Sequence, residues 1–210
     1  MVAPLIWLAS RSPRRRQLLT EAGLQHIAEH PGIEDSELIA PANAKPSEWV
    51  ASLAYLKACA GAAIVRERGI DEPLLVLGAD TACVQNGRMI GTPNSATEAR
   101  SMLESFCSES HEVVTGVALI GLETCETGVP KVRSLFASSA VVKWGNVSEA
   151  EIARYLASNA WQGKAGAYNL RERLDAGWPI TCEGDANGVM GLPVAAVIRK
   201  VTLLYAGGVS

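Results

Sequence analysis

The stretch LASRSPRRRQLL at residues 8–19 combines residue types that can bind an anion. Ser12 can cap a helix that begins at Pro13, and the first turn of that helix then carries Arg14 and Arg15. Backbone N–H groups at a helix start attract negative charge, and guanidinium groups add charge-assisted hydrogen bonds. The alternatives are an exposed basic turn or a kinase-type recognition sequence. Arginines are unfavourable at the positive end of a helix, which favours a bound anion such as phosphate.

A second candidate is the acidic residue that ends PLLVLGAD, residues 73–80. The apolar run is typical of a buried central strand, and we expect Asp80 at its carboxyl end, where α/β folds place their ligands. A carboxylate at this position could hold a divalent cation or accept a proton from water. The alternative is that Asp80 only caps a helix or shapes a turn.

A third candidate is the loop GKAGAY, residues 163–168. Lys164 has glycines close on both sides, so it could reach phosphate oxygens while the loop backbone approaches them. The loop lacks the ordered pattern G-x-x-x-x-G-K-[ST] and is therefore not a P-loop. Trp161 and Trp178 lie on either side of the loop in sequence, and for both we favour packing over stacking on a base.

Alternating strands and helices are predicted to position these stretches, as in an α/β fold with two lobes around a cleft. We expect strands at 4–9, 73–80, 111–121 and 131–143, the last two as antiparallel neighbours, and a tight hairpin at QNGRMI. We expect helices at 13–22, at 47–68 with Ser47 as its cap, at 95–106, at 148–158 with Ser148 as its cap, and in GLPVAAVIRKVTLLYAG.

The composition excludes several classes of protein. Of the 210 residues, 48% are hydrophobic and 20% are charged, which is ordinary for a globular protein, and no apolar stretch looks long enough to span a bilayer. The five cysteines include no C-x-x-C pair, which favours reduced thiols in the cytoplasm. A net charge of −3 and 5% aromatic residues count against nucleic-acid binding. The local positive charge therefore suits a small anion.

Taken in order, LASRSPRRRQLL, GADT, KAGAY and GLPV resemble the Maf family of nucleoside triphosphate pyrophosphatases. The resemblance runs from about Leu5 to the last helix, so we expect residues 1–210 to form a single Maf-like domain. It implies a Maf/inosine-triphosphatase-like α/β fold with a central mixed sheet and two lobes around a deep cleft. It also implies a homodimer, a Mg²⁺ or Mn²⁺ cofactor, and cleavage of a nucleoside triphosphate into a monophosphate and pyrophosphate.

The resemblance also implies roles for individual residues. Asp80 matches the acidic residue usually taken as the general base, which could activate water directly or by holding the metal. The residues expected to bind the substrate are Ser10, Arg14, Arg15, Lys57, Thr81, Lys164 and Arg171. The residues expected to bind the metal are Glu34, Asp35 and Asp80.

The chain departs from the family pattern at three positions. Asp35 stands where the family usually has a glutamate, and Thr92 replaces a lysine. Arg14 and Thr81 look like the branch that acts on dTTP and UTP, but Arg171 stands where that branch has a glutamine. A guanidinium only donates hydrogen bonds, whereas a glutamine amide both donates and accepts, so the preferred base stays open between dTTP or UTP and modified nucleotides. The alternative function is a nucleotide-sensing regulatory protein, related to septum formation, with weakened catalysis.

Overall fold

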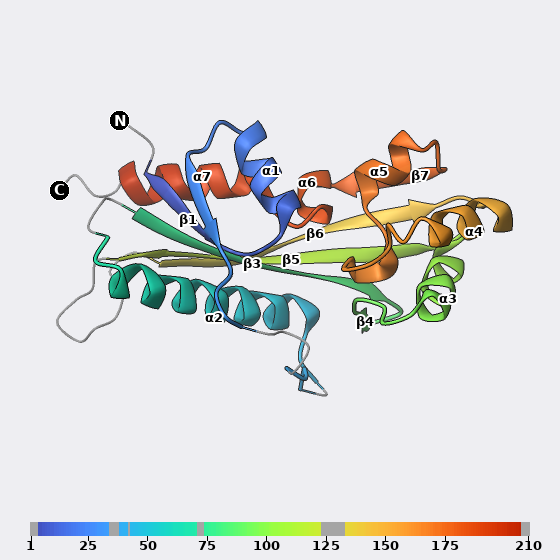
Figure 1. The fold of residues 1–210 in the computed structure, drawn as a ribbon, viewed down its shortest axis with the longest axis horizontal. Helices are drawn as coiled ribbons and strands as arrows, with labels where there is room; N and C mark the ends of the chain where they lie inside the picture. The colour runs from blue at the N-terminus through green and yellow to red at the C-terminus, as the bar shows by residue number, and fades with distance from the viewer. Residues whose placement is uncertain (1–3, 34–37, 42, 71–73, 123–132, 207–210) are drawn as a thin grey trace. The chain divides into compact units, whose positions relative to one another are not determined.

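The computed structural model of the protein describes residues 4–33, 38–41, 43–70, 74–122 and 133–206 (Figure 1). The strands are β1 Leu5–Ala9, β2 His26–Glu29, β3 Leu74–Gln85, β4 Arg88–Ile90, β5 Ser110–Gly121, β6 Arg133–Trp144 and β7 Ile180–Gly184. The helices are α1 Pro13–Glu21, α2 Pro46–Glu67, α3 Ala96–Phe106, α4 Glu149–Ala157, the 3-10 turn η2 Ala165–Ala167, α5 Leu170–Asp175, α6 Ala186–Val189 and α7 Val194–Ala206.

The strands form a mixed sheet in the order β2-β1-β3-β5-β6-β7, with β4 paired to β3. Strand β1 is parallel to both β2 and β3, and its Leu8 lies opposite Leu77 of β3. Strand β4 is antiparallel to β3, and β7 is antiparallel to β6. This arrangement confirms the predicted α/β class with a central mixed sheet.

The chain divides into two compact units, and strands β3, β5 and β6 contribute residues to both. Unit 1 comprises Met1–Asp80, Thr115–Ser138 and Gly191–Ser210, and unit 2 comprises Thr81–Val114 and Ser139–Met190. The assignment of the whole chain to one domain and the presence of a cleft stay predictions.

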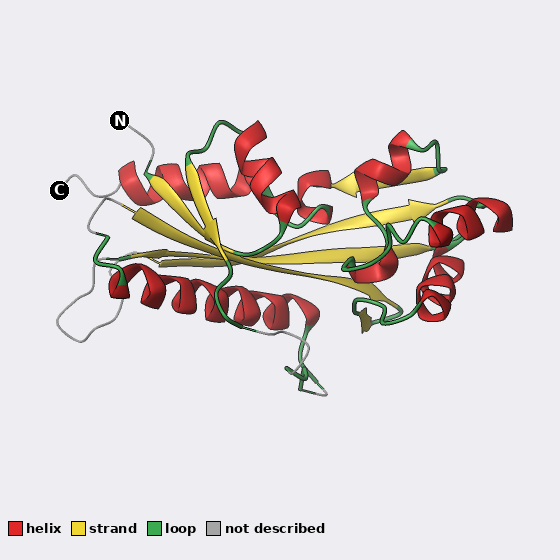
Figure 2. Cartoon of the chain, viewed as in Figure 1, coloured by secondary structure: helices red, strands yellow, loops and turns green. Residues whose placement is uncertain are grey.

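Within unit 1, helices cover both faces of the strands: α2 lies on one face, and α1 and α7 lie on the other (Figures 1 and 2). Helix α2 can lie very close to β3 because Gly78 has no side chain. A Cβ built on Gly78 would be 2.1 Å from the backbone oxygen of Ala54 and 2.7 Å from the backbone nitrogen of Ala58. A Cβ on Gly116 of β5 would likewise be 2.4 Å from the backbone nitrogen of Ala51. These glycines therefore determine how near α2 sits to the sheet.

Helix α2 corrects one expectation from the sequence. Its length and apolar composition are those of a helix that could cross a membrane, although half of its most apolar stretch is buried inside the protein. The core helix of a globular protein has the same two properties, and the close packing on Gly78 and Gly116 is of that kind. The prediction that the protein has no membrane partner is not tested by these properties.

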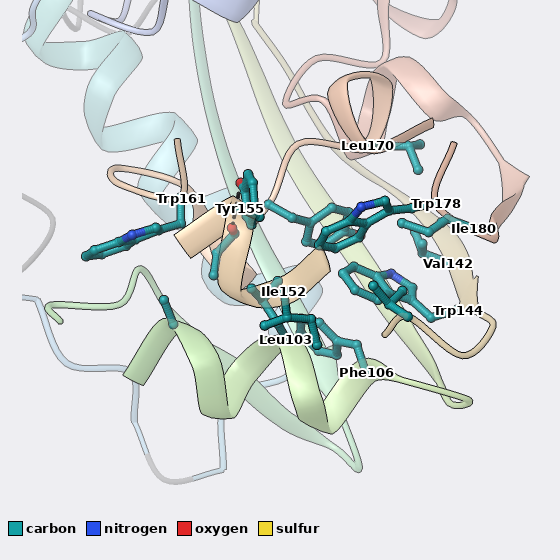
Figure 3. Close-up of a cluster of buried hydrophobic side chains, with 14 of the residues drawn as sticks. Leu103, Phe106, Val142, Trp144, Ile152, Tyr155, Trp161, Leu170, Trp178 and Ile180 are labelled. Atoms are coloured by element: carbon teal, nitrogen blue, oxygen red, sulfur yellow. Dashed lines mark hydrogen bonds between the residues drawn. The ribbon is translucent and has the colours of Figure 1, made fainter. Parts of the chain in front are cut away.

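Unit 2 is built around a cluster of aromatic side chains that come from α3, α4, β6 and the segment after α5 (Figure 3). The rings of Trp144 and Trp178 lie 5.3 Å apart at 75°, and those of Tyr155 and Trp178 lie 5.5 Å apart at 75°. Edge-to-face contacts of this kind add stability beyond the burial of the rings. Trp161 and Trp178 are both 5% exposed, which confirms that they pack in the core.

Most predicted elements are present, and three details differ. Helix α2 begins at Pro46 with Lys45 before it, so Ser47 is not its cap. The elements α5, β7 and α6 were not predicted, because each is short and carries little hydrophobic periodicity. Strand β3 continues five residues past Asp80, which is discussed below with the site. The predicted caps Ser12 and Ser148 are confirmed by hydrogen bonds from backbone N–H groups, and Ser95, predicted as the first residue of its helix, is the cap of α3.

Candidate active site

The arginine-rich corner is a helix start, as the sequence predicted. Strand β1 ends at Ala9, and α1 begins at Pro13 with Ser12 as its cap. The Ser12 hydroxyl accepts a hydrogen bond from the Arg15 backbone at 3.4 Å. The Ser10 hydroxyl accepts one from the Ser12 backbone at 3.2 Å, so both serines hold the turn together.

The side chain of Arg15 is held in a fixed position. Its Nε donates to the Gly191 carbonyl at 2.8 Å, and its Nη1 donates to the Ser10 hydroxyl at 3.2 Å. Gly191 begins the GLPV stretch and has a φ of +108°, a conformation that favours glycine. A Cβ at Gly191 would lie 3.3 Å from Arg15 Nε. The fold thus brings LASRSPRRRQLL and GLPV, two of the stretches that resemble the Maf family, into contact. The sequence analysis did not identify the role of Gly191 in anchoring Arg15.

A part-buried ion pair is the second part of the candidate site in unit 1. Lys57 of α2 donates to Asp80 of β3 at 2.7 Å, and the two side chains are 9% and 14% exposed. The close approach of α2 to β3 explains this contact. Ala58, the neighbour of Lys57 in α2, lies so near Gly78 that a side chain at Gly78 would collide with the Ala58 backbone. The sequence placed both residues in the site by resemblance alone, and it did not predict that they contact each other.

Asp80 lies inside a strand, and the prediction that it ends one is wrong. Strand β3 runs to Gln85 and then turns through Asn86 and Gly87 into β4. Asn86 has a φ of +51° and Gly87 a φ of +73°, the two positive values of a type I′ hairpin, which confirms the predicted turn. Strand β4 pairs with Cys83, Val84 and Gln85, the last three residues of β3.

The parallel pairing of β1 and β3 brings the two parts of unit 1 to the same region. Leu8 lies opposite Leu77, and from there Ser10 is two residues further along its strand direction and Asp80 three. The end of β1, which leads to Ser10, therefore lies beside the part of β3 that leads to Asp80. Arg15 contacts Ser10, and Lys57 contacts Asp80. A shared substrate for Arg15 and Asp80 stays a prediction.

The remaining predicted substrate residues lie in unit 1 or unit 2 as follows. Arg14 is half-buried in the first turn of α1 in unit 1. Thr81 is half-buried in β3, Lys164 precedes η2, and Arg171 is exposed in α5, all in unit 2. Thr92 is exposed in the same unit. Their contact with a substrate stays a prediction.

Of the three predicted metal ligands, the structure describes Asp80. Glu34 and Asp35 lie outside the residues that the structure describes. Among the described residues, no three His, Cys, Asp or Glu side chains gather as a metal site would require. Asp80 is the predicted ligand that can be placed, and Mg²⁺ bound with a triphosphate commonly uses only one or two protein carboxylates. The donor chemistry of Asp80 therefore fits such a cation.

The KAGAY loop is held by several contacts and is partly strained. Gly166 has a φ of +66°, and a Cβ there would lie 2.7 Å from the Cys83 sulfur. Ala167 also has a positive φ, +65°, which is uncommon for a residue with a side chain and costs about 1 kcal/mol or more. Tyr155 donates a hydrogen bond to the Ala167 carbonyl at 2.9 Å, and the Gly166 backbone donates to the Gly91 carbonyl at 3.0 Å. These contacts hold the loop in this conformation.

A buried histidine supports the end of the same loop. His111 is 3% exposed, its ring stacks on Phe106 at 4.0 Å, and its Nε2 is 2.8 Å from the Tyr168 hydroxyl. Burial lowers the pKa of His111 from 6.5 to about 4, and it raises the pKa of Tyr168. The sequence did not identify this pair, because nothing near His111 in the chain indicates that it will meet the loop 57 residues later.

The stability of the fold is expected to depend on the protonation of His111. The folded protein holds His111 neutral down to about pH 4, whereas the unfolded chain binds a proton below about pH 6.5. Stability is therefore retained above pH 6.5 and should fall by about 1–3 kcal/mol as the pH falls from 6.5 to 4. His111→Gln keeps an amide that can bond to Tyr168 but removes the titration. Urea unfolding of both proteins at about pH 7.5 and about pH 4.5 measures the difference; an equal loss of stability in both would contradict this role.

The family model described as "Maf-like protein" matches residues 5–203. The chain belongs to the Maf family. Three relatives of this Maf-family chain carry the name dTTP/UTP pyrophosphatase. The protein from Nitrosospira multiformis is 36% identical over 198 residues, which is 90% of this chain and 89% of the relative. The protein from Pelotomaculum thermopropionicum is 38% identical over 192 residues, covering 90% and 91%. The protein from Chromobacterium violaceum is 38% identical over 193 residues, covering 90% and 89%.

A solved structure, that of the Staphylococcus aureus Ham1 protein, aligns with 67% of this Maf-family chain and 71% of its own chain at 12% identity. Its TM-score is 0.37, which is too low for any argument about the fold. The Maf assignment rests on the match over residues 5–203 and on the three relatives.

Proposed function

We propose that this Maf-family chain hydrolyses nucleoside triphosphates between the α and β phosphates, releasing a monophosphate and pyrophosphate. The observation that supports the proposal is that Arg15 and Asp80 are each held by side-chain hydrogen bonds within unit 1. Both are held by buried or half-buried partners in unit 1, next to the neighbouring strands β1 and β3. A guanidinium held by two hydrogen bonds and a half-buried carboxylate are groups that suit a reaction in which water attacks a polyanion.

The proposed roles follow from the chemistry of each group. The guanidinium groups of Arg14 and Arg15 bind phosphate oxygens, since their fork of N–H donors matches that geometry. The backbone N–H groups at the start of α1 and the Ser10 hydroxyl lie at the same corner. Asp80 orients the attacking water and accepts its proton on a carboxylate oxygen, while Lys57 offsets negative charge beside it. Lys164, Thr81 and Arg171 are proposed as further substrate residues of unit 2.

We include a divalent cation, Mg²⁺ or Mn²⁺, in the proposal. Asp80 would supply a carboxylate ligand and the substrate phosphates would supply the other oxygens, with Glu34 and Asp35 as further proposed ligands. When bound, the cation would neutralise charge on the phosphates and help to activate water. We also propose a homodimer in the cytoplasm, which sedimentation of the purified protein and localisation of a tagged protein would test.

The proposed substrate is a pyrimidine nucleoside triphosphate. The three relatives named dTTP/UTP pyrophosphatase support this choice, as do Arg14 and Thr81. Arg171 offers only hydrogen-bond donors, which can still bind the carbonyl oxygens of uracil or thymine.

The product of hydrolysis tests the proposal most directly. The purified protein is incubated with dTTP, UTP, CTP, ATP and GTP, each with Mg²⁺ or Mn²⁺, and pyrophosphate is measured separately from orthophosphate. We expect pyrophosphate as the first product and the highest kcat/KM for dTTP or UTP. Orthophosphate as the first product would mean cleavage of a different bond, and no product from any triphosphate would favour the nucleotide-sensing alternative.

A further inference from the structure

Lys164 of the KAGAY loop forms an ion pair with Glu172 of α5, within unit 2. The Lys164 ammonium donates to a carboxylate oxygen of Glu172 in a short contact. The two side chains differ in access to water: that of Lys164 is 13% exposed and that of Glu172 is 44% exposed. The lysine is therefore enclosed by the protein, whereas the glutamate approaches it from the solvent side.

Each partner is fixed by contacts of its own. Lys164 precedes the turn in which Tyr155 and the Gly91 carbonyl hold Ala167 and Gly166, as described above. Glu172 lies in the first turn of α5, where its backbone N–H donates to the Asn169 side chain at 3.1 Å.

Helix α5 is held in turn by the residue that follows Glu172. The Arg173 guanidinium lies 4.1 Å from the ring centre of Tyr155 and 5.0 Å from that of Trp178. Both rings belong to the aromatic core of unit 2 (Figure 3). Cation–π contacts with two buried rings anchor helix α5. The helix in turn holds the Glu172 carboxylate beside the Lys164 ammonium.

An ammonium group interacts strongly with either a carboxylate or a phosphate oxygen. Under the proposed function Lys164 binds a phosphate group, and the Glu172 carboxylate is then a negative charge beside that phosphate. We infer that Glu172 is a counter-ion that Lys164 exchanges for phosphate, so that Glu172 positions the lysine in the free protein and weakens the binding of pyrophosphate. This inference rests on the proposed function and adds to it a residue that tunes product release.

The inference predicts that removing the charge of Glu172 strengthens the binding of pyrophosphate. Glu172→Gln removes the competing negative charge while keeping the shape of the side chain. Pyrophosphate with Mg²⁺ should then bind about fivefold to tenfold more tightly, because one charge-assisted contact no longer has to be exchanged. The KM for the triphosphate should fall in the same direction. The difference between the two proteins should shrink as KCl is raised, since salt screens a partly exposed charge.

The test measures the Kd of pyrophosphate by isothermal titration calorimetry for the wild type and three variants. Glu183→Gln is the matched control: Glu183 also belongs to unit 2 and pairs with Lys143 at 2.5 Å, but both side chains are well exposed. We expect this control to bind pyrophosphate like the wild type. Glu172→Asp keeps the charge on a shorter arm and should restore most of the wild-type Kd. Thermal unfolding of each variant confirms that the fold is retained.

The outcomes separate this inference from the proposed function. If the wild type releases pyrophosphate from triphosphates and Glu172→Gln binds pyrophosphate no more tightly than Glu183→Gln does, the counter-ion role is overturned and the proposed function stands. If the wild type neither binds pyrophosphate nor releases it, both are overturned. An equal gain in Glu172→Gln and Glu183→Gln would mean that only overall charge matters, which also overturns the inference.

Discussion

Asp80→Asn is expected to lower kcat for pyrophosphate release by about a hundredfold to ten-thousandfold, the range in which a positioned general base contributes. The asparagine amide has nearly the same shape as the carboxylate but cannot accept the proton of the attacking water. It also lacks the negative charge that a cation would need. The rate of pyrophosphate formation at saturating dTTP, compared with the wild type, is the measurement.

The same substitution should destabilise the protein, and this effect has to be separated from the loss of activity. The Lys57 ammonium is only 9% exposed, and Asp80→Asn removes the charge that faces it at 2.7 Å. We expect a loss of about 1–3 kcal/mol in the free energy of unfolding. The double variant Lys57→Met with Asp80→Asn removes both charges and should recover part of this stability without recovering activity.

The double variant separates a weakened fold from a lost reaction. If stability returns while hydrolysis stays absent, the activity was lost because the Lys57–Asp80 pair is missing and not because the fold was weakened. A well-folded Asp80→Asn protein with full activity would contradict the role of Asp80 as the base or the metal ligand.

Arg15→Ala is expected to lower kcat/KM for the triphosphate by about tenfold to a hundredfold, because a charge-assisted hydrogen bond contributes about 1.5–3 kcal/mol. The side chain is already held by Gly191 and Ser10, so the guanidinium loses little freedom when a phosphate binds. Initial rates over a range of dTTP concentrations give kcat and KM separately.

Two further variants interpret the Arg15 result. Arg16→Ala removes an exposed arginine from the next position of α1 and should change kcat/KM by less than about twofold. Arg15→Lys keeps the charge but loses the fork of donors that reaches both Gly191 and Ser10, so we expect it to restore only a small part of the activity. Equal effects of Arg15→Ala and Arg16→Ala would remove Arg15 from the site.

The local signals in the sequence were sufficient for many features of the fold. Ser12 before Pro13 marked the start of α1, and the Asn86–Gly87 pair marked the hairpin between β3 and β4. Such features depend on hydrogen bonds and backbone angles within a few neighbouring residues, so they can be read from a short stretch. Asn169 and Asp185 cap the short helices α5 and α6 by the same kind of hydrogen bond, but these helices are too short to show a hydrophobic period and were therefore missed.

The sequence by itself determined the α/β class, the helix start that carries Arg14 and Arg15, and membership of the Maf family. Only the tertiary structure decided which partner each charged side chain has. Arg15 meets the carbonyl of Gly191, which is 176 positions away, and Lys57 meets Asp80 because Gly78 lets α2 approach β3. Lys164 likewise meets Glu172 only when the KAGAY loop and α5 are both fixed. These contacts join elements that are distant or separately anchored, so their geometry depends on the packing of the whole unit and not on any local pattern.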